Sequence, residues 1–452
     1  MKLAPSAGHI CAALALGFVV LPAAPAQADG PGPGRAIACA TEALKDAIDA
    51  ANAAGGGTIR LARRCTYTLT AADNTGVNGA NGLPVITTPI TLRAGKNTTI
   101  ERSATAPAFR IFEVTGPAGA LTLDGTDRDR DRDDRDDHDD RDDRKDPWNA
   151  ANALLTSTGR DHGDDRDQTC RNGSGLTVQG GNSTGGGGAV FVDDDRSLTL
   201  HCVTLTDNTA ANGGAISNQG TAEVRASTFS GNSAEAGRGG AVISQDGELN
   251  LTASKLSQNT AGQGGAIAVE GGSATISNSL IEHNTAGDGG GAFAANALVD
   301  FHRSTIQHNT AISLGGGLAT TGGTVDLRWS SINENTARQA GGFQDQSHAV
   351  FEDSKVNGNT ATGLGGGIVV ILGDMTMTRS EVNENRANTG FGGGIVNSLT
   401  LTDVEVARNT ANAAAGGIQN NGTVTTNGQI RITDNAPTNC TGSPNPVPDC
   451  SG

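Results

Sequence analysis

The sequence predicts an all-β protein, a right-handed parallel β-helix (solenoid) with a short N-terminal capping helix. An asparagine recurs at ten positions 24 to 27 residues apart, an apolar residue stands three positions before each one, and a Gly-Gly pair follows nine of them. The asparagines are Asn208, Asn232, Asn259, Asn284, Asn309, Asn335, Asn359, Asn385, Asn409 and Asn435. The apolar residues are Leu205, Phe229, Leu256, Ile281, Ile306, Ile332, Val356, Val382, Val406 and Ile432.

Each repeat contains short alternating segments, such as residues 265–269, 274–277 and 279–282, that suit strands and not helices. One repeat has a single narrow apolar face, so successive repeats must stack, strand over strand, about 4.8 Å apart. The asparagines are expected to form a hydrogen-bonded ladder, and the threonine that usually follows them a second one. Asn182, before Gly187 and Gly188, is expected to belong to an earlier turn of the same kind.

The N-terminal residues predict export. Lys2 precedes an apolar run from Ile10 to Leu21, and residues 26–28 form a small-residue cleavage site, so residues 1–28 are interpreted as a signal peptide. The run is too short to cross a bilayer and no later run is long enough, which predicts a secreted protein, extracellular or associated with the cell surface, without a transmembrane anchor. Cys11 lies inside the run, which is not the position of a lipid-modified cysteine.

The mature chain divides into five expected regions. Residues 29–57 form an N-terminal cap, where Leu44, Ala47, Ile48 and Ala51 make a helical stripe within 41–54. Residues 58–125 form the first coils, 126–174 a charged insert, 175–436 the repeat β-helix, and 437–452 a cysteine-containing tail. The cap and the tail would cover the open ends of the solenoid, whose terminal strands expose unpaired backbone groups.

Six cysteines remain after signal removal: Cys39, Cys65, Cys170, Cys202, Cys440 and Cys450. An even number in an exported chain predicts disulfides. Proximity in sequence favours pairing each cysteine with its nearest neighbour in this order, although 15 pairings are open. Their spacing does not match that of metal-ligand clusters, so zinc is not expected.

The insert is strongly charged and has no apolar pattern. Residues 127–146 hold 12 Asp against seven Arg and Lys, which predicts a disordered, self-pairing polar loop at a coil corner. Calcium capture by the Asp residues and attraction to a cationic surface are the alternatives. The interleaved Arg disfavours both, and the lack of turn glycines at defined offsets further disfavours calcium. No other cofactor is expected.

Candidate catalytic residues are few. Asp193, Asp194 and Asp195 with Arg196 form the best acidic group of the coils, but a solvated turn is the favoured interpretation. The run from Asp161 to Asp165 resembles a hydrolase motif but lies in the insert. The repeats do not carry carboxylates at matching positions, as paired-carboxylate hydrolases on neighbouring coils would require.

Histidine occupies one repeat position twice in succession. His283 and His308 precede consecutive ladder asparagines, and Glu334 follows in the same row, which suggests a metal-binding or pH-sensitive patch. Gly, Gln and Arg stand at this position in other repeats, so free variation at an exposed site is the favoured interpretation. The formal net charge of −16, without a basic patch, argues against nucleic acid as a partner.

The repeat motif resembles known families. Phe229 to Ala234, followed by Gly239 to Val242, is similar to the repeats of chlamydial polymorphic membrane proteins and closer still to bacterial secreted β-helix repeat proteins. The segment from Cys39 to Leu61 and the Cys440–Cys450 tail match the ends of the latter. This resemblance covers nearly the whole mature chain and implies the pectin-lyase-like fold, but no activity.

Two functional hypotheses follow. The favoured one is a non-enzymatic binding or adhesion scaffold whose partner is an unidentified extracellular protein or polysaccharide. The alternative is a polysaccharide lyase or glycoside hydrolase of the same fold, supported by analogy of fold alone.

Overall fold

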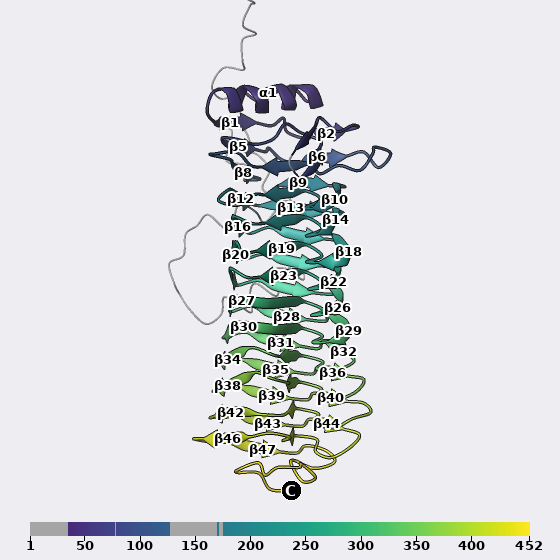
Figure 1. Ribbon diagram of the computed structural model, residues 1–452, viewed down its shortest axis with the longest axis vertical. Coiled ribbons are helices and arrows are strands. Elements are labelled where there is room, and N and C mark those ends of the chain that lie inside the picture. Colours follow the sequence, from purple (N-terminus) through teal and green to yellow (C-terminus); the bar gives the residue numbers. More distant parts are fainter. Residues whose placement is uncertain (1–34, 77, 127–169, 171–174) are drawn as a thin grey trace, which may run out of the picture. The chain divides into compact units, whose positions relative to one another are not determined.

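The computed structural model describes residues 35–76, 78–126, 170 and 175–452. By internal contacts the chain divides into Met1–Arg35 and Ala36–Gly452, and nearly all described residues belong to the second unit. That unit is a parallel β-helix with the helix α1 (Thr41–Ala53) at its N-terminal end (Figure 1). The predicted fold class is therefore confirmed. Within the described residues, no helix combines the length and apolar character needed to span a membrane.

The first and largest sheet receives two strands from most coils, and its neighbouring strands are parallel and in register. Two of its strands, β27 and β30, run unbroken for 11 residues where other coils have two shorter strands. Its members are β1 (Gly57–Arg60), β5 (Pro89–Arg93), β7 (Phe112–Val114), β8 (Ala120–Asp124), β11 (Val190–Val192), β12 (Ser197–His201), β15 (Ile216–Asn218), β16 (Thr221–Arg225), β19 (Val242–Gln245), β20 (Glu248–Thr252), β23 (Ile267–Glu270), β24 (Ser273–Ser277), β27 (Ala292–His302), β30 (Leu318–Arg328), β33 (Phe343–Asp345), β34 (His348–Glu352), β37 (Ile368–Val370), β38 (Asp374–Thr378), β41 (Ile395–Val396), β42 (Leu399–Thr402), β45 (Ile418–Gln419) and β46 (Val424–Asn427).

The second sheet carries the predicted apolar row, and all ten of those side chains are buried in the lumen. Burial of one such side chain stabilises the fold by about 1.5–3 kcal/mol. The strands are β2 (Thr66–Leu69), β6 (Thr98–Arg102), β9 (Leu176–Gln179), β13 (Val203–Thr206), β17 (Thr228–Ser230), β21 (Lys255–Ser257), β25 (Leu280–Glu282), β28 (Thr305–Gln307), β31 (Ser331–Asn333), β35 (Lys355–Asn357), β39 (Glu381–Asn383), β43 (Glu405–Ala407) and β47 (Arg431–Thr433).

The third sheet follows the recurring asparagine and closes the coil. Alanines from these strands point inward, and the preceding threonines lie on the outer face. The strands are β10 (Asn182–Gly186), β14 (Thr209–Asn212), β18 (Ser233–Arg238), β22 (Thr260–Gln263), β26 (Thr285–Asp288), β29 (Thr310–Leu314), β32 (Thr336–Ala337), β36 (Thr360–Ala361), β40 (Arg386–Ala387) and β44 (Thr410–Ala411).

The recurring asparagines lie buried at the corner between the second and third sheets. Each side-chain amide nitrogen, from Asn208 to Asn409, donates to the side-chain oxygen of the next asparagine at 2.9–3.0 Å. Each amide nitrogen also donates to a backbone carbonyl, as Asn309 does to Ile281 at 3.0 Å. These bonds satisfy buried polar groups that would otherwise destabilise the corner.

The second ladder differs from the prediction. The threonines stack in register on the third sheet, as Thr285 does on Thr310, but among the described residues no hydrogen bond joins their side chains. Serines at the corner between the first and second sheets form the second hydrogen-bonded row. The backbone nitrogen of each serine donates to the hydroxyl of the next at 3.1–3.2 Å. The serines are Ser227, Ser254, Ser279, Ser304, Ser330, Ser354 and Ser380. A hydroxyl inside a corner meets unpaired backbone groups, whereas the threonines on the outer face meet solvent.

The first coils lack a strand of the third sheet and carry instead the antiparallel hairpin of β3 (Asn74–Gly76) and β4 (Gly79–Asn81). Close to it, the Arg110 guanidinium and the Glu113 carboxylate form a fully buried ion pair at 3.2 Å, and Asn81 donates to the same carboxylate oxygen at 2.6 Å. Asn182 pairs with Thr209, and it is Gly181 that stands beside the ladder residue Asn208. The expected earlier turn is therefore present as β10, although Gly181 and not Asn182 occupies the position of the ladder asparagine.

Both ends of the β-helix are capped. Leu44 and Ile48 of α1 are fully buried on the first coils, and Cys39 and Cys65 form a disulfide. At the other end Cys440 and Cys450 are bonded, and the tail pairs with the last coil through Asn445, whose backbone nitrogen donates to the Asn420 carbonyl at 3.1 Å.

The insert leaves the solenoid at a corner. β8 precedes it and β9 follows it, and these strands stack on β12 and β13, which the single residue Cys202 joins in the next coil. Cys170, near the end of the insert, is bonded to Cys202. The remainder of the insert, including Asp161 to Asp165, lies outside the described residues, as does the signal segment.

Candidate functional site

The predicted acidic group lies in the turn between β11 and β12. The Thr115 hydroxyl donates to the Asp193 carboxylate at 2.7 Å, while Asp194 and Asp195 are exposed. The Arg196 guanidinium donates to the backbone carbonyl of Asp195 at 2.9 Å. The structure therefore brings these residues together as a locally bonded turn.

A different cluster lies farther along the first sheet, on the outer face of β27 and β30 and at the corner after them. We call it the Trp329 face, and it consists of Asp300, His302, Arg303, Asp326, Arg328 and Trp329. Both long strands hold their residues in register, so that Asp300 lies beside Asp326 and His302 beside Arg328. Carboxylates on neighbouring coils do therefore match, and the expectation that none would is wrong.

Arg328 holds the two carboxylates in place. Its guanidinium donates to Asp300 at 3.1 Å and to Asp326 at 2.8 Å. The next two coils extend the network, because Arg379 contacts both Glu352 and Asp353. The hydrogen bonds from Arg379 lower the pKa of Asp353. The result is a lattice of alternating charge across four coils. Charged hydrogen-bonding groups in fixed positions can bind the hydroxyl groups of a polar ligand.

Trp329 is an exception to its surroundings. Its side chain remains 53% exposed, and the backbone has a φ of +49°, in the left-handed region that bulky residues avoid. The equivalent corners of the four preceding coils hold Ala226, Ala253, Asn278 and Arg303, none of them aromatic. A strained and exposed tryptophan adds little to folding stability, so its presence points to contact with a ligand.

Two neighbours orient the indole ring. The His302 ring meets it edge to face with 5.2 Å between centroids, and the Arg303 guanidinium lies 5.9 Å from its centroid. Such contacts restrict the ring without covering it. A rigid exposed aromatic ring beside hydrogen-bonding groups can hold a sugar, whose C–H face packs on the ring while its hydroxyls reach the charged groups.

The expectation that carboxylates do not recur at matching repeat positions is the reason why the sequence did not reveal this face. The signal was present in the repeat frame: Asp300 and Asp326 each stand nine positions before a ladder asparagine, Asn309 and Asn335. Trp329 stands six positions before Asn335.

One group of possible metal ligands is brought together by the fold. Among the described residues, Cys170, His201 and Cys202 form a trio close enough to share an ion, which sequence spacing did not reveal. Cys170 and Cys202 are joined as a disulfide, so neither sulfur is a thiolate, the form that binds zinc. The Cys170–Cys202 disulfide therefore ties the end of the insert to the corner where the insert leaves the β-helix.

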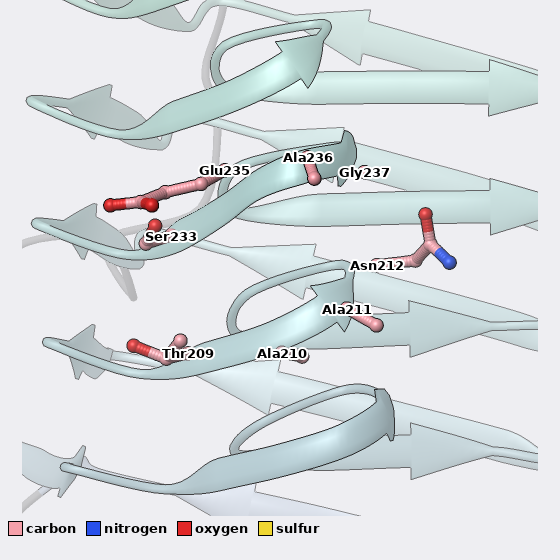
Figure 2. Close-up of a pocket in the computed structure, with 8 residues that line it drawn as sticks. All are labelled: Thr209, Ala210, Ala211, Asn212, Ser233, Glu235, Ala236 and Gly237. Atoms are coloured by element: carbon pink, nitrogen blue, oxygen red, sulfur yellow. The ribbon is translucent and has the colours of Figure 1, made fainter.

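A hollow of about 690 Å³ opens on the third sheet between β14 and β18. Its lining is mostly alanine, glycine and small polar residues, with one carboxylate, Glu235. Figure 2 shows Glu235 and Asn212 at opposite sides of the hollow, pointing apart. Without convergent polar groups this hollow does not have the character of a binding site.

A scan against protein-family models and a search of curated proteins found no match. Among solved structures, the mannuronan C-5 epimerase AlgE6 A-module of Azotobacter vinelandii is similar at 12% identity, over 87% of this chain and 97% of that one, with a TM-score of 0.38. A mutant tailspike protein of E. coli bacteriophage HK620, in complex with a pentasaccharide, is similar at 11% identity over 85% and 74%, with a TM-score of 0.35. PfbA, a surface adhesin of Streptococcus pneumoniae, is similar at 10% identity over 86% of both chains, with a TM-score of 0.33.

Proposed function

We propose that this protein is a secreted, non-enzymatic scaffold whose Trp329 face binds an extracellular polysaccharide. The observation that carries the proposal is Trp329 itself, a half-exposed ring in a strained backbone position beside fixed charged groups. Export is supported by the N-terminal apolar segment and by three disulfides, which are typical of oxidising compartments.

Charge favours a neutral glycan. On and beside the face, Asp300, Asp326, Glu352 and Asp353 stand against Arg303, Arg328 and Arg379, so no excess positive charge is present to attract a polyanion. The whole chain carries a formal net charge of −16, which repels acidic polysaccharides at long range. A protein partner is less well supported, because protein interfaces depend on a larger apolar centre than the exposed side chains of Trp329 and Leu298 supply.

Tryptophan fluorescence provides a direct test. The chain contains two tryptophans, and Trp148→Phe leaves Trp329 as the only reporter. Titration of this variant with neutral glycans should shift the emission in a saturable manner, and polygalacturonate or alginate should bind more weakly.

Trp329→Asn is the matching loss variant, because asparagine accepts the left-handed backbone. It should weaken binding at least tenfold in calorimetric titration. Leu372→Asn, which alters an exposed apolar residue outside the face (86% exposed), should leave binding unchanged. Undiminished glycan binding by Trp329→Asn would exclude the proposal.

The paired carboxylates support a second candidate, a polysaccharide lyase or glycoside hydrolase. Two carboxylates on neighbouring coils are the arrangement that glycoside hydrolysis uses. The test incubates the purified protein with polygalacturonates, alginates and neutral glycans, with and without Ca²⁺, and follows unsaturated products and reducing ends. Turnover that is lost in Asp300→Asn or Asp326→Asn but retained in Asp193→Asn would favour an enzyme over a scaffold.

A further inference from the structure

A pair of stacked imidazoles lies on the corner between the second and third sheets, away from the Trp329 face. His283 follows β25 and His308 follows β28, and these strands pair in register. Both residues have left-handed backbones, with φ values of +55° and +52°. The residues after them, Asn284 and Asn309, are bonded to each other in the ladder at 2.9 Å, so the backbone beneath both rings is rigid.

The two rings are close and nearly parallel. Their centroids are 5.2 Å apart with an interplanar angle of 25°, and both side chains are partly exposed. Two exposed imidazoles stacked in this way bury little area and would repel each other when protonated. Folding alone therefore gives little reason for histidine at both positions.

Each histidine has a carboxylate beside its Nδ1 atom. The distance from His308 Nδ1 to Glu334 Oε2 is 3.3 Å, and that from His283 Nδ1 to Glu282 Oε2 is 3.9 Å. A carboxylate at Nδ1 favours the tautomer with its proton there, which leaves the Nε2 lone pair for a metal ion. Carboxylate, imidazole and metal in sequence is the usual second-sphere arrangement of protein metal sites.

Glu282 is held in position by contacts from the strands on both sides of it, from Lys255 of β21 and from Gln307 of β28. The Lys255 ammonium lies 2.9 Å from one oxygen of Glu282, which leaves the other oxygen for Gln307 and His283.

We propose that His283 and His308 bind one divalent transition-metal ion, such as zinc, through their ring nitrogens. Water molecules complete a four-coordinate shell, and Glu334 stays beside His308 Nδ1 in the second sphere. Zinc binds imidazole nitrogen at about 2.0–2.1 Å, so the rings must turn toward each other from their stacked position, which exposed side chains can do by rotation about χ1 and χ2. Imidazole ligands suit zinc, copper and nickel better than calcium or magnesium.

The test is a calorimetric titration of the full chain with Zn²⁺, using glutamine variants. Glutamine is the matched replacement because Gln258 occupies the same corner position in the preceding coil with a φ of +59°. We expect one zinc site per chain that is weakened at least tenfold in His283→Gln or His308→Gln and absent in the double variant. His348→Gln, which removes an exposed histidine from β34, should bind zinc like the unchanged chain.

Copper provides a second readout. With one equivalent of Cu²⁺, the EPR spectrum should show coupling to two imidazole nitrogens, and each single variant should lose one. Absence of zinc binding by the unchanged chain would overturn the proposal. So would equal binding by the double variant, which would place the ion elsewhere, for example in the Asp-rich insert.

Discussion

Two corner rows of the same β-helix are subject to different physical constraints. At the corner between the second and third sheets, which we call the inner corner, asparagine occupies every coil from Asn208 to Asn435 and is buried. At the corner between the first and second sheets, which we call the outer corner, successive coils each contribute one residue with a left-handed backbone, and the residue type differs from coil to coil. These residues are Cys202, Ala226, Ala253, Asn278, Arg303, Trp329, Asp353, Arg379 and Asp403. The buried row of one residue type stabilises the fold, whereas the exposed row of varied residue types is available for contact with a ligand.

The largest expected effect comes from breaking the inner row. Asn309→Ala would leave the Asn284 backbone nitrogen without its acceptor, and would remove one of the two bonds from the Asn284 side-chain nitrogen and the side-chain bond to the Ile281 carbonyl. At about 1–3 kcal/mol for each buried group left unpaired, the free energy of unfolding should fall by several kcal/mol. Denaturant unfolding followed by circular dichroism measures this loss.

Asn388→Ala is the control, because Asn388 lies exposed on the chain after β40. Its effect should remain within about 0.5 kcal/mol. Equal destabilisation by the two variants would contradict a special role for the inner row.

A smaller, pH-dependent effect is expected for Asp345, a carboxylate inside the lumen. Burial raises its pKa, although hydrogen bonds from Ser347 and Thr320 oppose the shift. Because the folded-state pKa lies above the unfolded value, the protonated form stabilises the fold below the unfolded pKa, and this stability is lost as the pH rises through the folded pKa. Asp345→Asn mimics the protonated form.

Asp345→Asn should therefore be more stable than the unchanged chain at neutral pH, and the difference should vanish in acid, below the ordinary Asp pKa. Thermal unfolding between pH 3 and pH 8, about the range that spans an Asp pKa and neutrality, measures it. A difference that grows toward acid would show that the sign is wrong.

The smallest effects belong to the outer row. Ala253 has a φ of +49°, and asparagine tolerates this conformation better than alanine. Ala253→Asn should raise the free energy of unfolding by up to about 1 kcal/mol. Loss of stability would mean that the alanine side chain has a packing role that its corner position does not suggest.

Trp329→Asn sharpens the comparison further, because it should change ligand binding and not folding. Its free energy of unfolding should stay within about 0.5 kcal/mol of the unchanged chain, or rise as backbone strain is released. Calorimetry with glycan and denaturant unfolding on the same variant separate the two effects. A loss of several kcal/mol in unfolding would give Trp329 a structural role instead.

The sequence by itself determined the fold. A solenoid repeats the same local environment in every coil, so the asparagine row and the apolar row from Leu205 to Ile432 could be recognised by their period alone. The capping helix was equally accessible, since its apolar stripe through Leu44 and Ile48 depends only on helical periodicity.

Only the tertiary structure decided which outer residues meet. Asp300 and Asp326 are 26 residues apart in sequence and adjacent in space. His302 contacts Trp329 from the neighbouring coil. Repeat length varies from 24 to 27 residues, so spacing along the sequence does not by itself give the partner of an outer residue. Burial selects one register for the inward rows, and the outer rows follow the register that the interior imposes.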